Sequence, residues 1–178
     1  TVALIALFRW IILPRVREGS YSVHSGFYFR KWTVALATEV TLETLSSLYA
    51  TIYMRNWYRL MGAKIGKDAE ISTNLSGRYD LVEIGEKCFI ADEVVLGDED
   101  TRRGWMTLRK VRTGARVFVG NDAVVPVGAD IPTGALIGIK SKPPKNEDME
   151  AGGTWFGSPP IRLPVRQRFD TGSNWTYE

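Results

Sequence analysis

The 178-residue chain contains one cysteine, Cys88, and one histidine, His24. A single cysteine excludes an internal disulfide, and the two residues together cannot supply a zinc motif built from Cys and His. We therefore expect no metal site and a reducing compartment. The charge is nearly balanced, with 23 Lys and Arg against 20 Asp and Glu, so the small basic excess does not by itself predict a nucleic-acid partner.

The sequence also has little that could cross a bilayer unaided. Residues 1–13, TVALIALFRWIIL, are nearly all apolar but fall short of the roughly 20 residues that a spanning helix needs. The segment PRVREG follows them in place of a small-residue cleavage site, which excludes a secretory signal. We interpret residues 1–13 as the end of a longer membrane helix, in a chain that is a fragment of a larger protein.

The next two segments, 14–32 and 33–62, are predicted to lie at a membrane. Residues 14–32 form a loop that mixes basic with aromatic residues, as is typical near lipid headgroups. Residues 33–62 form an amphipathic helix in which Glu39 and Glu43 share a face. Each carboxylate would cost about 2.5–3.5 kcal/mol in hydrocarbon, so the helix is interfacial or spans the membrane with both carboxylates buried against other helices. A soluble helical hairpin is the alternative.

The most prominent pattern in the sequence is a six-residue repeat. The stretch VGNDAVVPVGADIPTGALIG, residues 119–138, places an aliphatic residue at every sixth position and alanine at the fifth place of each unit. Cys88 occupies this fifth place in an earlier block, so we interpret it as a core residue. The first positions of the ten units are Ile65, Ile71, Ile84, Ile90, Leu96, Thr113, Val119, Val125, Ile131 and Ile137.

A period of six differs from the helical 3.6 and is a multiple of the strand period of two, which indicates a solenoid. Each unit supplies one short strand with its aliphatic side chain inward, and three strands close a triangular coil. Ten units therefore predict about three coils, stacked about 4.8 Å apart. We predict a mainly β fold: a left-handed parallel β-helix over residues 63–142, preceded by membrane-associated α-helices. A β-sandwich of short strands is the competing interpretation.

Several segments lie outside the repeat frame. Residues 97–112, GDEDTRRGWMTLRKVR, form a charged insertion with one tryptophan. A loop that projects from a rigid solenoid is a common place for function, and a solvated loop is the alternative. Residues 143–168 are predicted to form an extended cap, and residues 169–178 a tail.

Three stretches resemble one known family. They are NWYRLMGAKIG at residues 56–66, the repeat stretch GARVFVGNDAVVPVGADIPTGALIG, and GTWFGSPPIRLPVRQ at residues 153–167. They are similar to the membrane-bound C-terminal domains of the ε-poly-lysine synthetase family of nonribosomal peptide synthetases. The resemblance implies an adenylation domain that uses ATP, a carrier domain with phosphopantetheine, and tandem β-helix domains that form a pseudo-trimer. It implies a membrane location with the β-helix facing the cytoplasm. A homotrimer is the alternative assembly.

The implied reaction is amide (isopeptide) bond formation between a carrier-bound aminoacyl thioester and a free amino acid or a growing polymer such as ε-poly-lysine. The site must deprotonate the amine, hold it near the thioester carbonyl and stabilise the oxyanion. Hexapeptide acyltransferases usually use a histidine base, and the loop after the third hexad of a block has none here. A noncatalytic pseudo-subunit and a stand-alone trimeric acyl-CoA acyltransferase therefore stay open as alternatives.

The predicted catalytic residues are Glu99, Asp100, Asn121 and His24. Glu99 or Asp100 is expected to bind a cationic amine, and to act as base if burial raises its pKa. Asn121 is expected to donate a hydrogen bond, with a turn residue as the alternative. His24 is a further candidate base, with a packed or interfacial histidine as the alternative.

Two other groups of residues are predicted to bind substrate or donor. The WFGSPP stretch is expected to border a pantetheine channel, to cover the end of the core, or both. The predicted substrate-binding residues are Asp98, Arg102, Arg103 and Trp105, and the predicted pantetheine- and carrier-binding residues are Lys140, Ser141, Trp155, Gly157 and Ser158.

Overall fold

The structure is a computed structural model that describes residues 2–44 and 54–164. Parts of three predicted segments lie outside the described residues. They are positions 45–53 of the predicted helix at 33–62, the end of the predicted cap at 165–168, and the whole predicted tail at 169–178.

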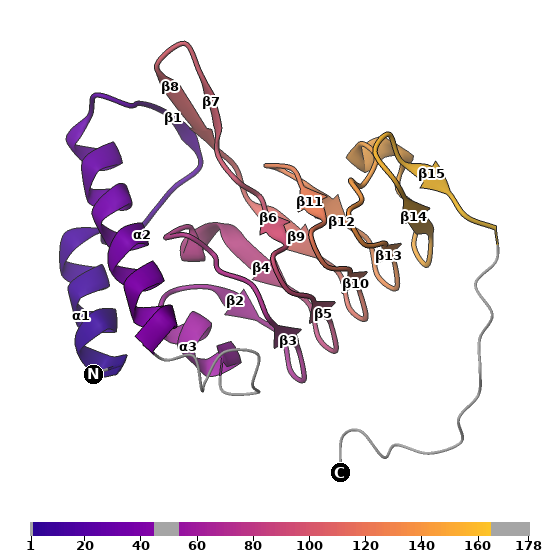
Figure 1. The fold of residues 1–178 in the computed structure, drawn as a ribbon, viewed down its shortest axis with the longest axis horizontal. Coiled ribbons are helices and arrows are strands. Elements are labelled where there is room, and N and C mark those ends of the chain that lie inside the picture. The colour runs from indigo at the N-terminus through magenta and orange to yellow at the C-terminus, as the bar shows by residue number, and fades with distance from the viewer. Residues whose placement is uncertain (1, 45–53, 165–178) are drawn as a thin grey trace.

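Within the described residues, three helices precede the repeat. Helices α1 (Val2–Ile12) and α2 (Gly26–Thr44) lie side by side at one end of the molecule, and α3 (Met54–Leu60) leads into the first strand (Figure 1). Helix α2 begins seven residues before the predicted start at 33, because the Ser25 hydroxyl accepts a hydrogen bond from the Tyr28 N–H and caps the helix. No helix in the described ranges is both long and apolar enough to cross a bilayer.

The repeat forms a parallel β-helix with three faces, each a stack of short strands. The first face consists of β2 (Lys64–Ile65), β4 (Val82–Ile84), β9 (Val111–Thr113) and β12 (Asp130–Ile131). The second consists of β3 (Glu70–Ile71), β5 (Phe89–Ile90), β10 (Phe118–Val119), β13 (Leu136–Ile137) and β14 (Thr154–Phe156). The third consists of β6 (Val95–Leu96) and β11 (Val124–Val125). Parallel pairing on every face confirms the β-helix and excludes the β-sandwich.

The predicted repeat positions coincide with the strands. All ten first positions lie in strands of the three faces and are buried, the most exposed being Thr113 at 8%. Cys88 is buried among them, as predicted. The first face stacks four strands, which makes four coils where the count of units predicts about three. The difference arises because the third face has strands only in the two middle coils. The first and last coils therefore use two units each instead of three, and ten units extend over four coils.

The predicted insertion at 97–112 is an ordered hairpin. Its strands β7 (Asp100–Arg102) and β8 (Trp105–Leu108) pair antiparallel, and β1 (Gly19–Ser22) adds to β8 as a third strand. We call this three-stranded unit the hairpin arm; it projects away from the β-helix (Figure 1). A second, smaller hydrophobic core lies at its base, formed by Leu13, Val16, Val34, Leu81, Met106 and Leu108.

The far end of the β-helix is closed by the cap. After the short 3₁₀ helix η3 (Asn146–Asp148), β14 continues the second face and β15 (Ile161–Arg162) pairs antiparallel with it. The Trp155 ring belongs to the main hydrophobic core and is only 8% exposed. The cap therefore covers the end of the core, which is one of the two roles predicted for it.

Candidate functional site

The acidic residues at the foot of the hairpin arm form an ion-pair network with two buried cations. Glu99 accepts hydrogen bonds from Lys31 Nζ at 2.8 Å and from Arg78 Nη1 at 2.9 Å. Arg78 also pairs with Asp98. Lys31 comes from α2, and Arg78 directly precedes the 3₁₀ helix η2 (Tyr79–Leu81). Both cations are almost fully buried, so the network fastens the arm to the helices and to the first coil.

This pairing determines the protonation of Glu99. Burial by itself would raise the pKa of Glu99, but the hydrogen bonds and positive charges of Lys31 and Arg78 lower it to about 2. A carboxylate with that pKa is a poor general base at neutral pH. Its two oxygens are also already occupied by cations, so the structure does not favour Glu99 as the base or as the ligand of a cationic amine.

The depressed pKa of Glu99 predicts acid sensitivity. Because the pKa is about 2 in the folded chain and about 4.3 in an unfolded one, the stabilisation is complete above about pH 4.5. It is lost as pH falls toward 2, by on the order of 2 kcal/mol. Urea titrations from pH 7 to pH 2.5 should show this decline, and Glu99→Gln should flatten it. An equally steep decline in Glu99→Gln would contradict the assignment.

The tip of the hairpin arm brings together several of the predicted site residues. Ser22 lies opposite Trp105 in the β1–β8 register, and the Val23 N–H donates to the Gly104 carbonyl at 2.9 Å. His24 is therefore held beside the turn that contains Arg103, and it is exposed. Trp105 is 55% exposed, and Arg102 pairs with Asp100 at 3.0 Å on the outside of the arm. The tip thus presents one imidazole, one indole and basic side chains to solvent.

Asn121 lies away from this tip, at a corner between the second and third faces. Its carbonyl accepts a hydrogen bond from the Lys140 N–H at 2.8 Å, which links adjacent coils. The Asn121 side chain is exposed. This position matches the turn residue that the sequence left open as the alternative.

The predicted pantetheine-binding residues lie together at the cap. The Ser141 hydroxyl accepts a hydrogen bond from the Gly157 N–H at 2.8 Å and donates one to the Ile139 carbonyl at 2.9 Å. Ser141 and Trp155 are buried, whereas Lys140 and Ser158 are exposed. Since the buried pair is committed to packing and hydrogen bonding, the predicted residues that stay open to a donor are Lys140, Ser158 and the half-buried Gly157.

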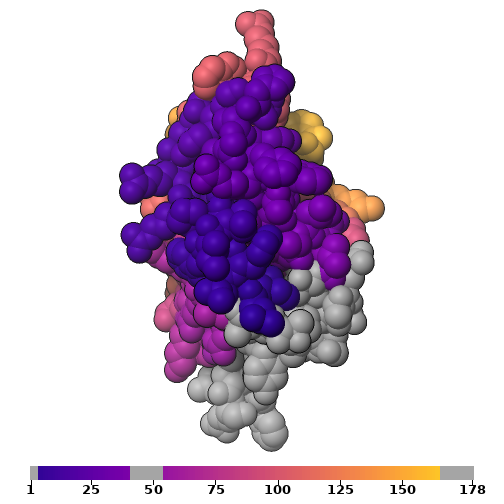
Figure 2. All heavy atoms as spheres, turned by 90° about the vertical axis from the view of Figure 1, so that its left-hand side faces the viewer, coloured from indigo at the N-terminus to yellow at the C-terminus, as the bar shows by residue number. Residues whose placement is uncertain are grey.

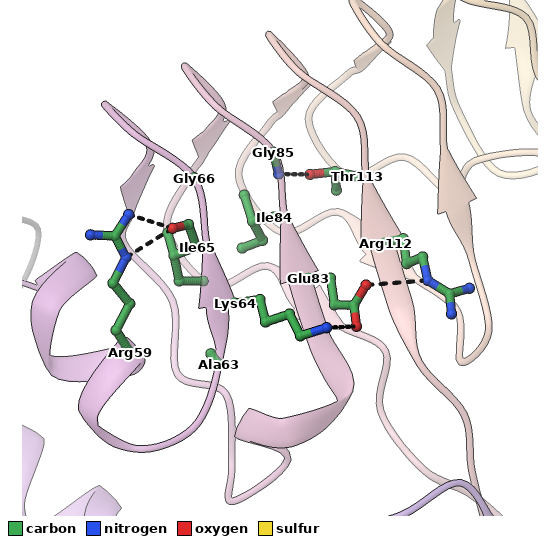
Figure 3. A pocket seen from close by; sticks show the side chains of 10 residues that line it. All are labelled: Arg59, Ala63, Lys64, Ile65, Gly66, Glu83, Ile84, Gly85, Arg112 and Thr113. Atoms are coloured by element: carbon green, nitrogen blue, oxygen red, sulfur yellow. Dashed lines mark hydrogen bonds and ion pairs between the residues drawn. The ribbon is translucent and has the colours of Figure 1, made fainter.

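Sequence reasoning missed a pocket of about 500 Å³ on the first face (Figure 3). Its charged lining residues are Arg59, Lys64, Glu83 and Arg112, above a floor of glycine and aliphatic residues. Lys64, Glu83 and Arg112 are direct neighbours on consecutive strands. The repeat does predict that these three side chains point outward, because each residue precedes an inward-facing repeat position by one. Only the stacking shows that they are adjacent.

Glu83 is the centre of this charged group. Lys64 Nζ and Lys110 Nζ each donate to its Oε1 at 3.0 Å, and Arg112 Nε lies 3.4 Å from Oε2. Hydrogen bonds from Lys110 and Lys64 lower the pKa of Glu83 to about 2. One permanently ionised carboxylate thus holds three cations in place.

Comparison with known proteins gives one close relative in sequence. The chain is 46% identical over 167 residues to a delta-poly-L-ornithine synthetase of Acinetobacter baumannii, strain AB307-0294. The match covers 94% of this chain but only 12% of the synthetase, so the chain corresponds to a small part of that protein. No protein-family model matches the chain.

Solved structures resemble the chain at low sequence identity. A maltose O-acetyltransferase from Clostridium difficile 630 superposes with a TM-score of 0.54 at 15% identity, covering 90% of this chain and 97% of the enzyme. A serine acetyltransferase from Neisseria gonorrhoeae gives a TM-score of 0.45 at 14% identity, covering 92% of this chain and 68% of the enzyme. The chain, a parallel β-helix built on a six-residue repeat, therefore shares its fold with the maltose O-acetyltransferase.

Proposed function

We propose that this hexapeptide-repeat β-helix is an acyl-transferring unit of a larger synthetase that polymerises a cationic amino acid. The observation that carries the proposal is the 46% identity over nearly the whole chain to the delta-poly-L-ornithine synthetase. The acetyltransferase-like fold supports it, because that fold serves acyl transfer in the maltose O-acetyltransferase. Lysine and ornithine, each with a second amino group on its side chain, are the substrates we propose.

The proposed reaction is aminolysis of a thioester. The neutral amine of an amino acid or growing polymer attacks the carbonyl carbon of an aminoacyl thioester, a C–N bond forms, and the C–S bond breaks. The amine loses a proton and the departing thiolate gains one. The proposed donor is the phosphopantetheine arm of a separate carrier domain, and ATP is consumed only at a separate adenylation domain.

His24 is the residue we propose as the base. Glu99 is held by Lys31 and Arg78 with a pKa of about 2, whereas the His24 side chain is exposed beside Arg103 and Trp105. An imidazole nitrogen can accept a proton from an ammonium group. Trp105 offers a face for the aliphatic part of the acceptor or the donor arm. The proposed site is completed at the seam with a neighbouring β-helix, in a pseudo-trimer of tandem domains or a homotrimer.

The test is chain formation by the full synthetase that contains this unit. His24→Ala is expected to lower the rate of chain elongation about 100-fold, with adenylation and carrier loading unchanged. Lys145→Ala, an exposed position at the start of the cap segment, serves as the control. An unchanged elongation rate in His24→Ala would rule out His24 as the base.

One observation favours a second function, that of a noncatalytic unit completing the assembly. Glu99, a carboxylate that the sequence suggested as a base, is instead part of a structural ion-pair network. The single histidine lies outside the β-helix. If His24→Ala and Trp105→Ala both leave elongation unchanged while deletion of the unit abolishes assembly of the synthetase, this second function holds.

We further propose that the helical end contacts a membrane surface, with the β-helix on the cytoplasmic side. Figure 2 shows that α1 and α2 dominate this face of the molecule. Seven exposed apolar residues of these two helices recur at helical spacing: Leu4, Leu7 and Ile11 on α1, and Phe29, Trp32, Leu36 and Val40 on α2. Such a stripe suits burial in the interfacial region of a bilayer.

This contact predicts binding of the chain to lipid vesicles. The Trp32→Asp, Leu36→Asp double variant should reduce co-flotation with phosphatidylcholine and phosphatidylglycerol vesicles at least tenfold, because two charges then enter the apolar face. Phe118→Asp on the second face of the β-helix is the matched control and should float normally. Equal flotation of the double variant and the wild type would refute the proposed face.

A further inference from the structure

We propose that the first-face pocket is a binding site for an anionic ligand with two or more phosphoryl groups. The site is separate from the hairpin-arm tip and from the cap, and it goes beyond the acyl transfer proposed above. It lies toward the helical end of the β-helix, where α3 and the first three coils line it (Figures 1 and 3).

The pocket carries an excess of positive charge. Its lining contains three cations, Arg59, Lys64 and Arg112, and one carboxylate, Glu83. Lys110 adds a fourth cation, since its Nζ donates to the same Glu83 oxygen as Lys64 does. Two further carboxylates border the region. Glu18 accepts a hydrogen bond from the Lys110 N–H, and Asp130 lies opposite Arg112 in the strand register.

Arg59 is the cation whose charge is least compensated. Its Nε and Nη2 both donate to the Ile65 carbonyl, at 2.8 and 2.5 Å. That acceptor is neutral, and within the part of the chain that the structure describes no carboxylate lies within ion-pair distance of Arg59. The carbonyl fixes the guanidinium at the edge of the pocket with its charge available to a ligand.

Arg112 is the second guanidinium with N–H groups available to a ligand. Only its Nε faces Glu83, at 3.4 Å, and Figure 3 shows both terminal nitrogens pointing away from that carboxylate. A guanidinium edge with two N–H groups matches a pair of phosphate oxygens. The Lys64 ammonium lies between the two arginines along the lining and uses one of its N–H bonds on Glu83, so it retains further donors.

The separation of these groups sets the size of the ligand. Lys64 and Arg112 lie on strands β2 and β9, with β4 between them, so their backbones are roughly 10 Å apart at the usual strand spacing. The charged ends of Lys64 and Arg112 meet at Glu83, so the longer span is the one from Arg59 to Arg112, which has Lys64 and Glu83 between them (Figure 3). A chain of two or three phosphoryl groups suits that span better than a single phosphate does. Because the pocket is open to water, several charge-assisted hydrogen bonds are needed for useful affinity.

Glu83 has a specific part in this proposal. It orients Lys64 and Lys110 when the pocket is empty, and it repels an incoming anion. Removal of the Glu83 charge should therefore strengthen the binding of a polyphosphate. If the ion pairs served only to stabilise the fold, the same substitution would not increase polyphosphate affinity.

The test is isothermal titration calorimetry of the 178-residue chain at low salt with inorganic tripolyphosphate, pyrophosphate and orthophosphate. We expect tripolyphosphate to bind at least tenfold more tightly than orthophosphate. Arg112→Ala and Arg59→Ala should each weaken tripolyphosphate binding about tenfold, and Glu83→Gln should strengthen it several-fold. Lys142→Ala, an exposed cation outside the pocket lining, should change nothing.

Three results would overturn the proposal. These are the absence of tripolyphosphate binding to the wild-type chain, equal weakening by Lys142→Ala and Arg112→Ala, and a failure of folded Glu83→Gln to bind more tightly. Far-UV circular dichroism establishes that each variant is folded. If Glu83→Gln does not fold, the comparison of Arg112→Ala with Lys142→Ala decides the matter alone.

Discussion

Arg78→Ala is expected to destabilise the chain by about 3–5 kcal/mol, the range typical of removing one partner from a buried ion pair. The Arg78 side chain is 4% exposed and pairs with Asp98 and Glu99. Its loss leaves Asp98 without this partner and leaves Lys31 as the one cation paired with Glu99 within the described residues. Equilibrium urea unfolding at pH 7, followed by circular dichroism, measures the change in the free energy of unfolding.

Arg102→Ala is the matched control for this variant. Arg102 also forms an ion pair, with Asp100, but its side chain is 83% exposed. An exposed pair contributes at most about 1 kcal/mol, so the control should unfold almost like the wild type. If both variants lost a similar free energy of unfolding, burial of Arg78 would not be the reason for the contribution of its ion pairs to stability.

Gly85→Ala is expected to cost about 3 kcal/mol or more, because the coils stack too closely for a side chain there. A Cβ atom at Gly85 would lie 2.2 Å from the Gly114 carbonyl oxygen and 2.4 Å from its carbonyl carbon. Both are backbone atoms of the next coil and cannot rotate away, so the clash forces adjacent strands apart. The measurement is again the free energy of unfolding in urea, accompanied by the midpoint of thermal unfolding.

Gly104→Ala separates this packing effect from the general cost of replacing glycine. A Cβ atom at Gly104 meets nothing within 4 Å, but its φ of 80° is unfavourable for alanine, and about 1 kcal/mol is expected. The Gly85 variant should therefore be the less stable of the two by a clear margin. The reverse order would show that the coils relax around the added methyl group.

Much of the β-helix could be predicted from the sequence, because its repeat is local. A residue such as Val125 or Ile131 faces inward as a consequence of its place in a six-residue unit, and both are fully buried. The number of coils was less certain, since it depends on where irregular segments replace strands. The third face shows this, with strands in only two of the four coils.

The candidate site could be predicted only in part. Trp105 and Arg103 were selected as loop residues, but nothing local indicates that β1 joins β8 and holds His24 beside them. Glu99 was selected as a base because it is acidic and lies in an insertion. Its partner Lys31 is 68 residues away in the chain, so the sequence could not reveal that its pKa is lowered instead of raised.

The sequence by itself determined the architecture: hydrophobic burial at every sixth residue specifies short strands, inward faces and stacked coils without reference to distant residues. Only the tertiary structure decided which charged groups meet. It paired Glu99 with Lys31 and Arg78, and it aligned Lys64, Glu83 and Arg112 on consecutive strands. The physical reason is that burial follows a local periodic pattern, whereas protonation and ligand binding depend on distances between side chains that folding alone brings together.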